Sequence, residues 1–448
     1  MKNTIRRYSE FKESEIDKLG IIPEIWSVHR VKDIVTKIGS GVTPRGGSAV
    51  YEDVGIPFLR SQNVYDDGLR LENVSFISSQ IHNEMKSSQL KHDDILINIT
   101  GASIGRTCLV PASLRQANIN QHIAFLRIRR SLNFLYIAWF LKSCFIKNYI
   151  QIEQNGASKE AFNLSQIANI PLALPPISEQ KAIARYLDTK TAQIDRKIDL
   201  LTQKAQRYEE LKRSLINETV TRGLDKSVPM KDSAIEWIGE IPEHWQIRRI
   251  KDITVSDVSV KTPSQLKGTD LIEFLPMSNV NESLGAIKEF NFVELDSVSS
   301  GYTKFKNDDV IFAKITPCME NGNVALVKDL RYGIGFGSTE FMVFRSRKEL
   351  LPQYFRYFFH NILFRKNAKP FMKGTAGQKR ITSLYMSTHG FGLPPLSEQK
   401  AITEYLDRKT EHIDRIIENI NTQVEIQKEL RKTLINDVVT GKIKVIDN

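Results

Sequence analysis

Short polar stretches between apolar runs contain most of the side chains suited to specific binding. Arginine, lysine, asparagine and glutamine form paired hydrogen bonds with guanine and adenine edges in the major groove, and hydroxyl groups bond to bases or phosphates. In the first half of the chain the candidates are Ser40, Thr43, Arg45, Arg60, Gln62, Asn63, Asn98, Thr100, Ser103, Arg106 and Gln121. In the second half they are Lys261, Ser278, Asn279, Lys314, Thr316, Glu320, Asn321, Asn323, Lys379 and Arg380. Any one of these loops, taken alone, is more often a solvated turn.

The sequence contains none of the common motifs for catalysis or metal binding. It has no G-x-x-x-x-G-K run, no H-E-x-x-H pair and no Asn-Pro-Pro or Asp-Pro-Pro run, since both Pro-Pro pairs follow leucine (Leu174 and Leu393). Cys108, Cys144 and Cys318 lie far apart without a C-x-x-C pair, which argues against a zinc site or a disulfide framework. We therefore predict a chain without catalytic residues, metal or cofactor of its own.

Three short runs imitate functional motifs. The run GIGFG (333–337) resembles a nucleotide-binding loop, but the residues after it predict a strand where such a loop needs a helix, so we expect a turn. Glu179-x-Lys181 and Glu398-x-Lys400 match half of a nuclease site, yet neither has a partner carboxylate nearby in the sequence. We interpret both pairs as capping and surface residues.

Length and composition describe an ordinary folded protein. The chain has 448 residues, 41% hydrophobic and 26% charged, which suits about two to four domains. No apolar run reaches the roughly 18 residues that cross a bilayer, and the charged N-terminus lacks the apolar stretch of a signal peptide, so we expect a cytoplasmic protein. The net charge of +11 favours a polyanionic partner without proving one, and residues 1–171 (21 basic, 16 acidic) and 225–390 (23 and 19) share the excess.

The sequence contains the same segments twice, 219 residues apart. Residues 19–34 and 238–253 are identical at nine of 16 positions, and residues 174–221 and 393–440 at 25 of 48. Between these segments the two copies differ. Similar ends with different middles indicate one scaffold that carries two different specificities. A duplicated enzyme whose copies have drifted apart is the alternative.

The repeated segments 178–221 and 397–440 predict long helices. Apolar residues recur every seven positions, with a second set four positions later, which is the heptad pattern of paired helices. The predicted seam consists of Leu187, Ile194, Ile198, Leu201, Tyr208, Leu406, Ile413, Ile417, Ile420 and Leu434. Ser178 and Ser397 are expected to cap the first turns. We expect these helices, about 60 Å long, to form one antiparallel pair; packing on two separate cores is the alternative.

The divergent stretches predict compact domains of mixed structure. Residues 35–130 contain short apolar or alternating runs separated by Gly, Pro, Asn and Asp, which indicate strands and turns, and an apolar helix is predicted at 132–153. Residues 255–346 repeat this scheme, with a helix predicted at 350–366. The expected fold class is therefore α+β: two α+β domains joined by two long antiparallel coiled-coil helices, with a pseudo-twofold internal repeat.

With these motifs in view, nearly the whole chain resembles the specificity subunit of type I restriction-modification enzymes. The resemblance rests on the doubled G-x-I-P-x-x-W (Gly20–Trp26 and Gly239–Trp245) and the doubled LPP-[IL]-SEQKAI before each long helix. It rests also on FAKITPCMENG, GFGSTEF and G-x-x-GQKRI in the second half, and more loosely on SGVTPRGG and TGASIG in the first. Each motif alone is weak, but their order, present twice, is highly specific.

The resemblance implies a non-catalytic subunit with two target recognition domains, each reading one half of a split, asymmetric site on double-stranded DNA. The coiled coil would set the length of the unread spacer, and its outer faces would dock two copies of an adenine methyltransferase subunit. S-adenosylmethionine, ATP and Mg²⁺ would be bound by that subunit and by the restriction and translocase subunits. A coiled-coil scaffold that joins proteins without reading DNA is the competing hypothesis, and an enzyme with an unrecognised site is a third.

The resemblance also implies the domain boundaries. We expect an N-terminal segment (1–20), a first target recognition domain (21–171), a central long helix (172–224), an entry segment (225–239), a second target recognition domain (240–390) and a C-terminal long helix (391–448).

Overall fold

The chain folds into two compact units. Unit 1 comprises residues 1–201 and 422–448, and unit 2 comprises residues 202–421. The computed structural model describes residues 7–154, 161–256, 260–281, 285–375 and 377–445. Both units contain part of the two long helices, α6 (Ile177–Arg222) and α13 (Leu396–Val439). Every helix in these described ranges is too short or too polar to serve as a membrane-spanning segment.

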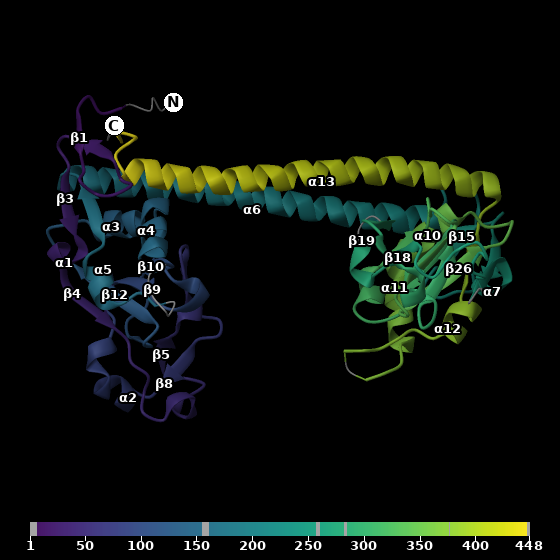
Figure 1. The fold of residues 1–448 in the computed structure, drawn as a ribbon, viewed down its shortest axis with the longest axis horizontal. Coiled ribbons are helices and arrows are strands. Elements are labelled where there is room, and N and C mark those ends of the chain that lie inside the picture. The colour runs from purple at the N-terminus through teal and green to yellow at the C-terminus, as the bar shows by residue number, and fades with distance from the viewer. Residues whose placement is uncertain (1–6, 155–160, 257–259, 282–284, 376, 446–448) are drawn as a thin grey trace. The chain divides into compact units, whose positions relative to one another are not determined.

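Unit 1 is built on two small β-sheets (Figure 1). Its strands are β1 (Phe11–Glu13), β2 (Ile21–Pro23), β3 (Ser27–Arg30), β4 (Val35–Ser40), β5 (Ile56–Leu59), β6 (Val64–Tyr65), β7 (Gly68–Leu69), β8 (Ser75–Ile77), β9 (Ile95–Asn98), β10 (Thr107–Leu109), β11 (Asn118–Ile119), β12 (Ile123–Ile128) and β13 (Pro171–Leu174). One sheet has the antiparallel order β10-β9-β12-β4, and the other has the order β11-β5-β8, in which β11 runs parallel to β5. Two-stranded pairs join β1 to β2, β3 to β13 and β6 to β7.

Short helices cover these sheets. They are α1 (Val31–Ile34), α2 (Ser79–Glu84), α3 (Phe134–Leu141), α4 (Cys144–Gln154) and α5 (Leu164–Ala168), with 3₁₀ turns η1 (Gly47–Val50), η2 (Ser61–Asn63), η3 (Lys86–Ser88) and η4 (Gly101–Ser103). The single helix expected at 132–153 is wrong, because the chain breaks between α3 and α4. At the break the buried Ser143 hydroxyl accepts a hydrogen bond from the Ile146 amide (3.4 Å), which starts a new helix.

Unit 2 repeats this plan. Its strands are β14 (Met230–Asp232), β15 (Glu240–Pro242), β16 (Gln246–Arg249), β17 (Thr254–Ser256), β18 (Leu271–Leu275), β19 (Val280–Asn281), β20 (Ala286–Ile287), β21 (Asn291–Glu294), β22 (Thr303–Lys306), β23 (Asp309–Ala313), β24 (Val324–Leu326), β25 (Ile334–Gly337), β26 (Phe341–Ser346) and β27 (Gly390–Leu393). The sheets have the orders β17-β26-β23-β24 and β21-β18-β25-β22, and β18 runs parallel to β25. Smaller pairs join β14 to β15, β16 to β27 and β19 to β20. The α+β class is confirmed in both units.

The helices of unit 2 also correct one expectation. They are α7 (Ile250–Ile253), α8 (Leu295–Val298), α9 (Cys318–Asn321), α10 (Pro352–His360), α11 (Ile362–Ala368) and α12 (Ser383–Thr388), with η5 (Met277–Asn279) and η6 (Lys369–Phe371). The single helix expected at 350–366 is two helices. Asn361 separates them, because its side-chain oxygen accepts hydrogen bonds from the amides of Leu363 (2.7 Å) and Phe364 (3.3 Å) and caps α11.

The GIGFG run is a strand and not the expected turn. Gly333 turns the chain with φ 69°, and the next four residues form β25. A Cβ atom on Gly335 would lie 2.4 Å from the Phe305 ring, so the glycine gives that ring its place in the core. The GIGFG run therefore has a role in packing the core of unit 2.

The two units share buried polar contacts at repeat-related positions. Asp94 binds the guanidinium of Arg127 through both carboxylate oxygens (2.8 and 2.7 Å), and Asp309 binds that of Arg345 in the same way (both 2.7 Å). Both carboxylates are almost fully buried. Because a buried carboxylate needs such a partner, these pairs fix the same sheet geometry in each unit.

The starts of the long helices differ from expectation. Helices α6 and α13 begin one residue before Ser178 and Ser397, so the serines lie inside the first turn and are not its caps. The carboxylate of Glu179 accepts a hydrogen bond from the Trp26 indole (3.2 Å). Repeat-related Glu398 does the same with Trp245 (3.0 Å). These glutamates therefore hold each helix start against its unit, and are more than the surface residues we expected.

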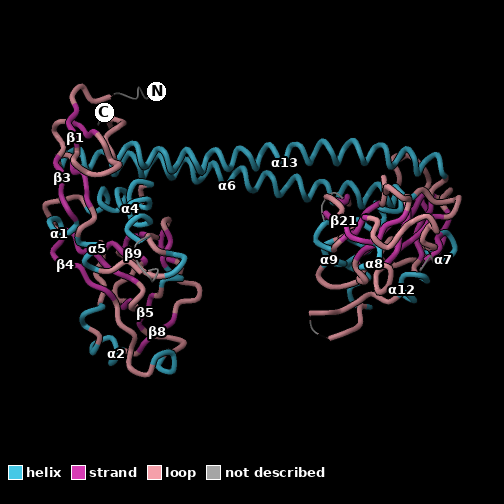
Figure 2. The backbone as a smooth tube through the Cα atoms, in the orientation of Figure 1, coloured by secondary structure: helices cyan, strands magenta, loops and turns pink. Residues whose placement is uncertain are grey.

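Within each unit the two long helices run antiparallel, side by side (Figure 2). In unit 1, Arg431 on α13 forms an ion pair with Asp195 on α6 (2.9 Å); in unit 2, repeat-related Lys212 forms one with Asp414 (2.6 Å). Continuing the heptad from Ile198 leads to Lys212, so a cation occupies a seam position. Among the predicted seam residues, Leu187, Leu406, Ile413 and Ile420 are buried and Ile194, Ile198, Leu201, Tyr208, Ile417 and Leu434 are half-buried.

Candidate nucleic-acid interface

In unit 1 the loops with candidate side chains leave the same end of the sheets. Because β5 and β11 run parallel, the loops after them start side by side, and the Asn120 amide donates to the Leu59 carbonyl (3.0 Å). The Gly41 amide donates to the Ile123 carbonyl (3.1 Å), which places the loop after β4 at the same end. A Cβ atom on Gly41 would lie 2.0 Å from the Ile119 carbonyl oxygen, so only glycine permits this approach.

A chain of hydrogen bonds connects three of these loops. The Thr43 hydroxyl donates to the Gln121 side-chain oxygen. The Gln121 side-chain nitrogen lies 3.2 Å from Nε2 of His122, and Nδ1 of His122 lies 2.7 Å from the Thr100 hydroxyl. Gln121 and Thr43 are exposed, while His122 and Thr100 are half-buried. The structure thus brings together three predicted residues, Thr43, Thr100 and Gln121, and adds His122.

The prediction that Asn63 and Asn98 contact a ligand is wrong. Asn98 is completely buried, and its side-chain nitrogen donates to the Ser61 carbonyl (2.8 Å) and the Ser103 hydroxyl (3.0 Å). Asn63 is 2% exposed, accepts from the Arg60 amide (2.9 Å) and donates to the Arg70 carbonyl (2.8 Å). Because both side chains are buried and donate to backbone carbonyls inside the fold, they shape loops and do not reach a ligand.

The other candidates of unit 1 lie at the surface or close to it. Arg45 and Gln62 are exposed, and Ser40, Arg60, Ser103 and Arg106 are half-buried. The Arg106 guanidinium lies 4.6 Å from the centre of the Tyr65 ring, and that of Arg60 lies 5.9 Å from the Tyr51 ring. Stacking on an aromatic ring limits the conformations of each arginine and leaves its charge available.

Unit 2 builds the corresponding loop cluster at the corresponding sheet end. The Ser338 amide donates to the Leu275 carbonyl (3.1 Å), as Asn120 does to Leu59 in unit 1. The run 377–380 joins the cluster, because the Thr316 amide donates to the Lys379 carbonyl (2.9 Å) and the Lys379 amide donates to the Thr316 hydroxyl (3.0 Å). Three of the candidate residues, Thr316, Lys379 and Arg380, therefore lie together on one surface.

Arg380 is held by a carboxylate. Its Nε donates to Oε2 of Glu340 (2.9 Å) and its Nη2 to Oε1 (2.7 Å). These hydrogen bonds lower the pKa of the Glu340 carboxyl below its usual range. Lys379 is exposed and Lys314 is half-buried. Paired charges of this kind fix a side chain in one orientation.

One further candidate of unit 2 needs correction, and the others differ in their exposure. Asn323 is 4% exposed and donates to the Val280 carbonyl (3.4 Å), so it belongs to the interior. Glu320, in α9, forms an ion pair with Lys369 (2.6 Å) and its backbone carbonyl accepts from Arg365 (2.8 Å), so its contact role stays a prediction. Asn279 is half-buried and donates to the Glu289 carbonyl (3.2 Å). Lys261, Ser278 and Asn321 are exposed.

Sequence reasoning missed His122 and Glu340. They are repeat-related, because the Ile99 amide donates to the His122 carbonyl (3.0 Å) and the Lys314 amide donates to the Glu340 carbonyl (2.9 Å) at the same place in each unit. The divergent middles concealed this equivalence, and only the shared Asp-Asp run at the starts of β9 and β23 offered a register.

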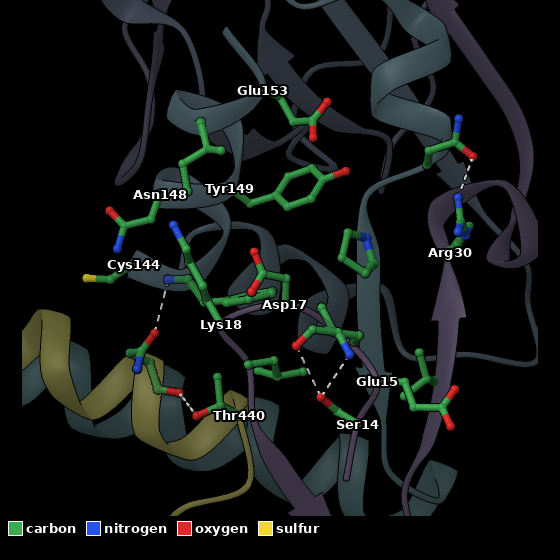
Figure 3. A pocket seen from close by; sticks show the side chains of 18 of the residues that line it. Ser14, Glu15, Asp17, Lys18, Arg30, Cys144, Asn148, Tyr149, Glu153 and Thr440 are labelled. Carbon is green, nitrogen blue, oxygen red and sulfur yellow. Dashed lines mark hydrogen bonds between the residues drawn. The ribbon is translucent and has the colours of Figure 1, made fainter. Parts of the chain in front are cut away.

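A separate hollow of about 730 Å³ lies on unit 1, between α4 and the loop 14–19 (Figure 3). Acidic and basic side chains balance in its lining: Glu15, Asp17 and Glu153 against Lys18, Arg30 and Lys442. In unit 2 the position of Lys18 is taken by Trp237, whose ring packs on His389 with centroids 5.5 Å apart. None of the candidate residues lines the hollow, and it has no excess of positive charge for a polyanion.

The described residues contain no group of three His, Cys, Asp or Glu side chains arranged to hold a metal ion. Each unit is one copy of a duplicated scaffold, and the two copies carry different polar loops at the same end. That is the construction of a recognition protein.

Comparison with known proteins identifies its family. Residues 23–210 and 242–426 each match the type I restriction modification DNA specificity domain, and the chain belongs to that family. It is 24% identical over 440 residues to the putative type I restriction enzyme MjaX specificity subunit of Methanocaldococcus jannaschii, covering 97% of both chains. It is 22% identical over 442 residues to the EcoKI specificity subunit of Escherichia coli K12, covering 95% of this chain and 90% of that one.

Solved structures show the same fold. A chain from a study of complex assembly and conformational transition of the type I R-M system superposes with a TM-score of 0.71 at 15% identity, covering 93% of this chain and 98% of that chain. The HsdS subunit from Thermoanaerobacter tengcongensis superposes with a TM-score of 0.55 at 15% identity, covering 94% and 98%. The family consists of non-catalytic DNA-recognition subunits, so the chain is not an enzyme by itself.

Proposed function

We propose that this chain is the sequence-specificity subunit of a type I restriction-modification complex and binds a bipartite, asymmetric DNA site, one half-site per unit. The observation that carries the proposal is the loop cluster, built at the same sheet end in both units but with different side chains. Gln121 and Thr43 are prominent in unit 1, and Lys379 and Arg380 in unit 2. A shared frame with different polar side chains suits the reading of two different half-sites.

Two linked readers gain affinity from their linkage. Once one unit is bound, the other meets the same duplex at a high effective concentration, so two modest affinities combine. The net charge of +11 adds attraction to phosphates that does not depend on sequence and weakens with salt. Specific binding therefore needs few base contacts in each unit.

We further propose residues 21–171 and 240–390 as the target recognition domains, with the helices within 172–224 and 391–448 as the element that sets the spacer. Helix α6 is continuous from Ile177 to Arg222 and α13 from Leu396 to Val439. A continuous paired helix resists bending, which is the property that a molecular spacer requires.

The remaining machinery belongs to partner subunits in this proposal. Two copies of an adenine methyltransferase subunit, with S-adenosylmethionine, would dock on the outer faces of the long helices. Restriction and translocase subunits would supply the chemistry that uses ATP and Mg²⁺. The specificity subunit would act in the cytoplasm, where these subunits meet DNA.

Selection from random DNA tests the proposal. The chain and its methyltransferase partner are mixed with a pool of random duplexes, and bound DNA is sequenced. We expect a split motif with two different halves. K379A/R380A is expected to relax only the half read by unit 2, and T43A/Q121A only the other half.

The competing hypothesis is a coiled-coil scaffold that reads no sequence. It predicts a stable complex with the methyltransferase subunit and no enriched motif from the same pool. That result, obtained with folded wild-type protein, would remove the proposed function.

A further inference from the structure

We propose that His122 in unit 1 and Glu340 in unit 2 are the positioning residues of the two readers, each fixing the side chain that contacts the bases. The inference rests on the proposed function and adds specificity-determining residues to it. Both side chains are half-buried, next to the first residue of β12 and of β26. Both are anchored by the repeat-related backbone hydrogen bonds from Ile99 and Lys314.

In unit 1 the direction of each hydrogen bond in the chain follows from the orientation of the Gln121 amide. The Gln121 oxygen accepts from Thr43, so its nitrogen faces His122 as a donor. Nε2 of His122 must then accept, and Nδ1 carries the proton that it donates to the Thr100 hydroxyl. The imidazole thereby holds the nitrogen end of the Gln121 amide, while Thr43 holds its oxygen.

The held amide keeps the groups that base recognition needs. Gln121 is exposed, and after these contacts it retains one N–H and one oxygen lone pair. An adjacent donor and acceptor is the pair with which glutamine binds adenine in the major groove. If the amide turned over, donor and acceptor would exchange places, so orientation decides the pattern presented.

In unit 2 a carboxylate does the same for arginine. Glu340 occupies Nε and one hydrogen of Nη2, and the Gln378 carbonyl lies 3.4 Å from Nη1. One hydrogen on each of Nη1 and Nη2 remains on a side chain that is 43% exposed. Those two hydrogens form the fork that suits guanine or a phosphate. An unanchored surface arginine loses more rotational freedom on binding.

The glutamate is informative because its charge opposes DNA. A carboxylate at a surface that attracts phosphates lowers affinity for any sequence, so its place there requires a compensating role. Replacing it with alanine should therefore have two opposite effects. Binding to unrelated DNA should rise, and preference for the specific site should fall.

The first test compares E340A and E340Q with wild type, each with the methyltransferase partner. We expect E340A to bind random DNA more tightly and to lose about tenfold in preference at half-site 2, the value of one displaced base contact. E340Q, which keeps the shape and one acceptor oxygen, should lie between. The control is E349A, which removes an exposed carboxylate that is also paired with an arginine, Arg248. Unchanged half-site preferences in folded E340A would overturn the assignment.

The second test separates the acceptor at Nε2 of His122 from the rest of the imidazole ring. H122Q places a carbonyl oxygen near the position of Nε2 and keeps an acceptor for Gln121, whereas H122A removes both contacts. We expect H122A to relax half-site 1 alone and H122Q to retain more of its preference. H29A, which removes a half-buried histidine hydrogen-bonded to Ser27, is the control.

The possible outcomes distinguish a failure of the proposed function from a failure of the positioning role. A wild-type chain that selects no split motif defeats the proposed function itself. A wild-type split motif that H122A and E340A leave unchanged, with folding verified by thermal unfolding, defeats only the positioning role. Relaxation of both half-sites by either variant also contradicts it, because each anchor is assigned to one unit.

Discussion

Lys379 and Arg380 are neighbours with different surroundings. Arg380 is fixed by Glu340 through two hydrogen bonds, whereas the exposed Lys379 is located through its backbone contacts with Thr316. A fixed fork suits base recognition, and a flexible ammonium suits the phosphate backbone. The two side chains are therefore expected to differ in what their removal changes.

K379A should weaken binding equally for every DNA sequence. Because one phosphate contact would be lost, the slope of log affinity against log salt should fall by about one. Fluorescence anisotropy at several salt concentrations measures both effects. K348A, beyond the other end of β26, is the control and should leave the slope unchanged. A sequence-dependent loss would instead assign Lys379 to a base.

Burial also makes one histidine of unit 2 sensitive to acid. Burial lowers the pKa of His389 to about 4, while an unfolded histidine titrates near 6.5. Between these values the unfolded chain binds a proton that the folded unit does not, so protons favour unfolding. We expect stability to fall by about 1.4 kcal/mol per pH unit from this group as pH decreases from about 6.5 to 4.

The repeat supplies the matching substitution. Ile250 donates to the carbonyl of His389 just as Val31 donates to that of Ile170, so H389I inserts the residue of unit 1. H389I should remove part of the acid sensitivity; His360, whose pKa burial also lowers, keeps the rest. Denaturant unfolding followed by tryptophan fluorescence, with Trp237 stacked on His389, reports it. Equal pH slopes in both proteins would contradict the account.

At the scale of elements, the paired helices contain charge inside their seam. The Lys212 side chain is 4% exposed and that of Asp414 is 22% exposed. Removing the Asp414 carboxylate takes an ion-pair partner from an almost fully buried ammonium, which is costlier than taking one from a half-buried carboxylate. The burial of the two partners therefore sets the order of the two substitutions.

A double-mutant cycle tests this order. D414N should destabilise by roughly 3 kcal/mol and K212M by about 1 kcal/mol, and the double variant should resemble K212M. Chemical denaturation gives the free energies of unfolding. The exposed pair Lys428–Glu425 is the control, with a coupling of about 0.5 kcal/mol or less. A coupling as small for Lys212–Asp414 would mean that the seam charge is not specific.

At the scale of the whole molecule, the proposed spacer role predicts a ruler effect. Deleting 202–208 from α6 and 418–424 from α13 removes one heptad from each while both interhelical ion pairs keep their register. Seven helical residues span about 10 Å, or about three base pairs. The preferred spacer should shorten by up to that amount, with both half-site sequences retained. DNA selection reports it, and an unchanged spacer would argue against the ruler.

The duplication, the α+β class and the long helices could be predicted from the sequence. Repeats at a constant offset, period-two runs and heptads are patterns in the sequence itself, and they can be recognised without knowledge of the tertiary contacts. The same reasoning failed where a break depends on one side chain, as at Ser143 and Asn361, and at the glycines of β25, whose role is to admit Phe305.

The candidate surface was only partly predictable. The sequence pattern alone located the loops, and its candidate residues included Gln121, Thr100 and Arg380, because polar side chains between predicted strands can be recognised in the sequence. Only the tertiary structure decided that Asn63, Asn98 and Asn323 turn inward and that His122 and Glu340 hold their neighbours. The reason is physical: burial and hydrogen-bond partners arise from residues distant in sequence, which parallel strands bring to one sheet end.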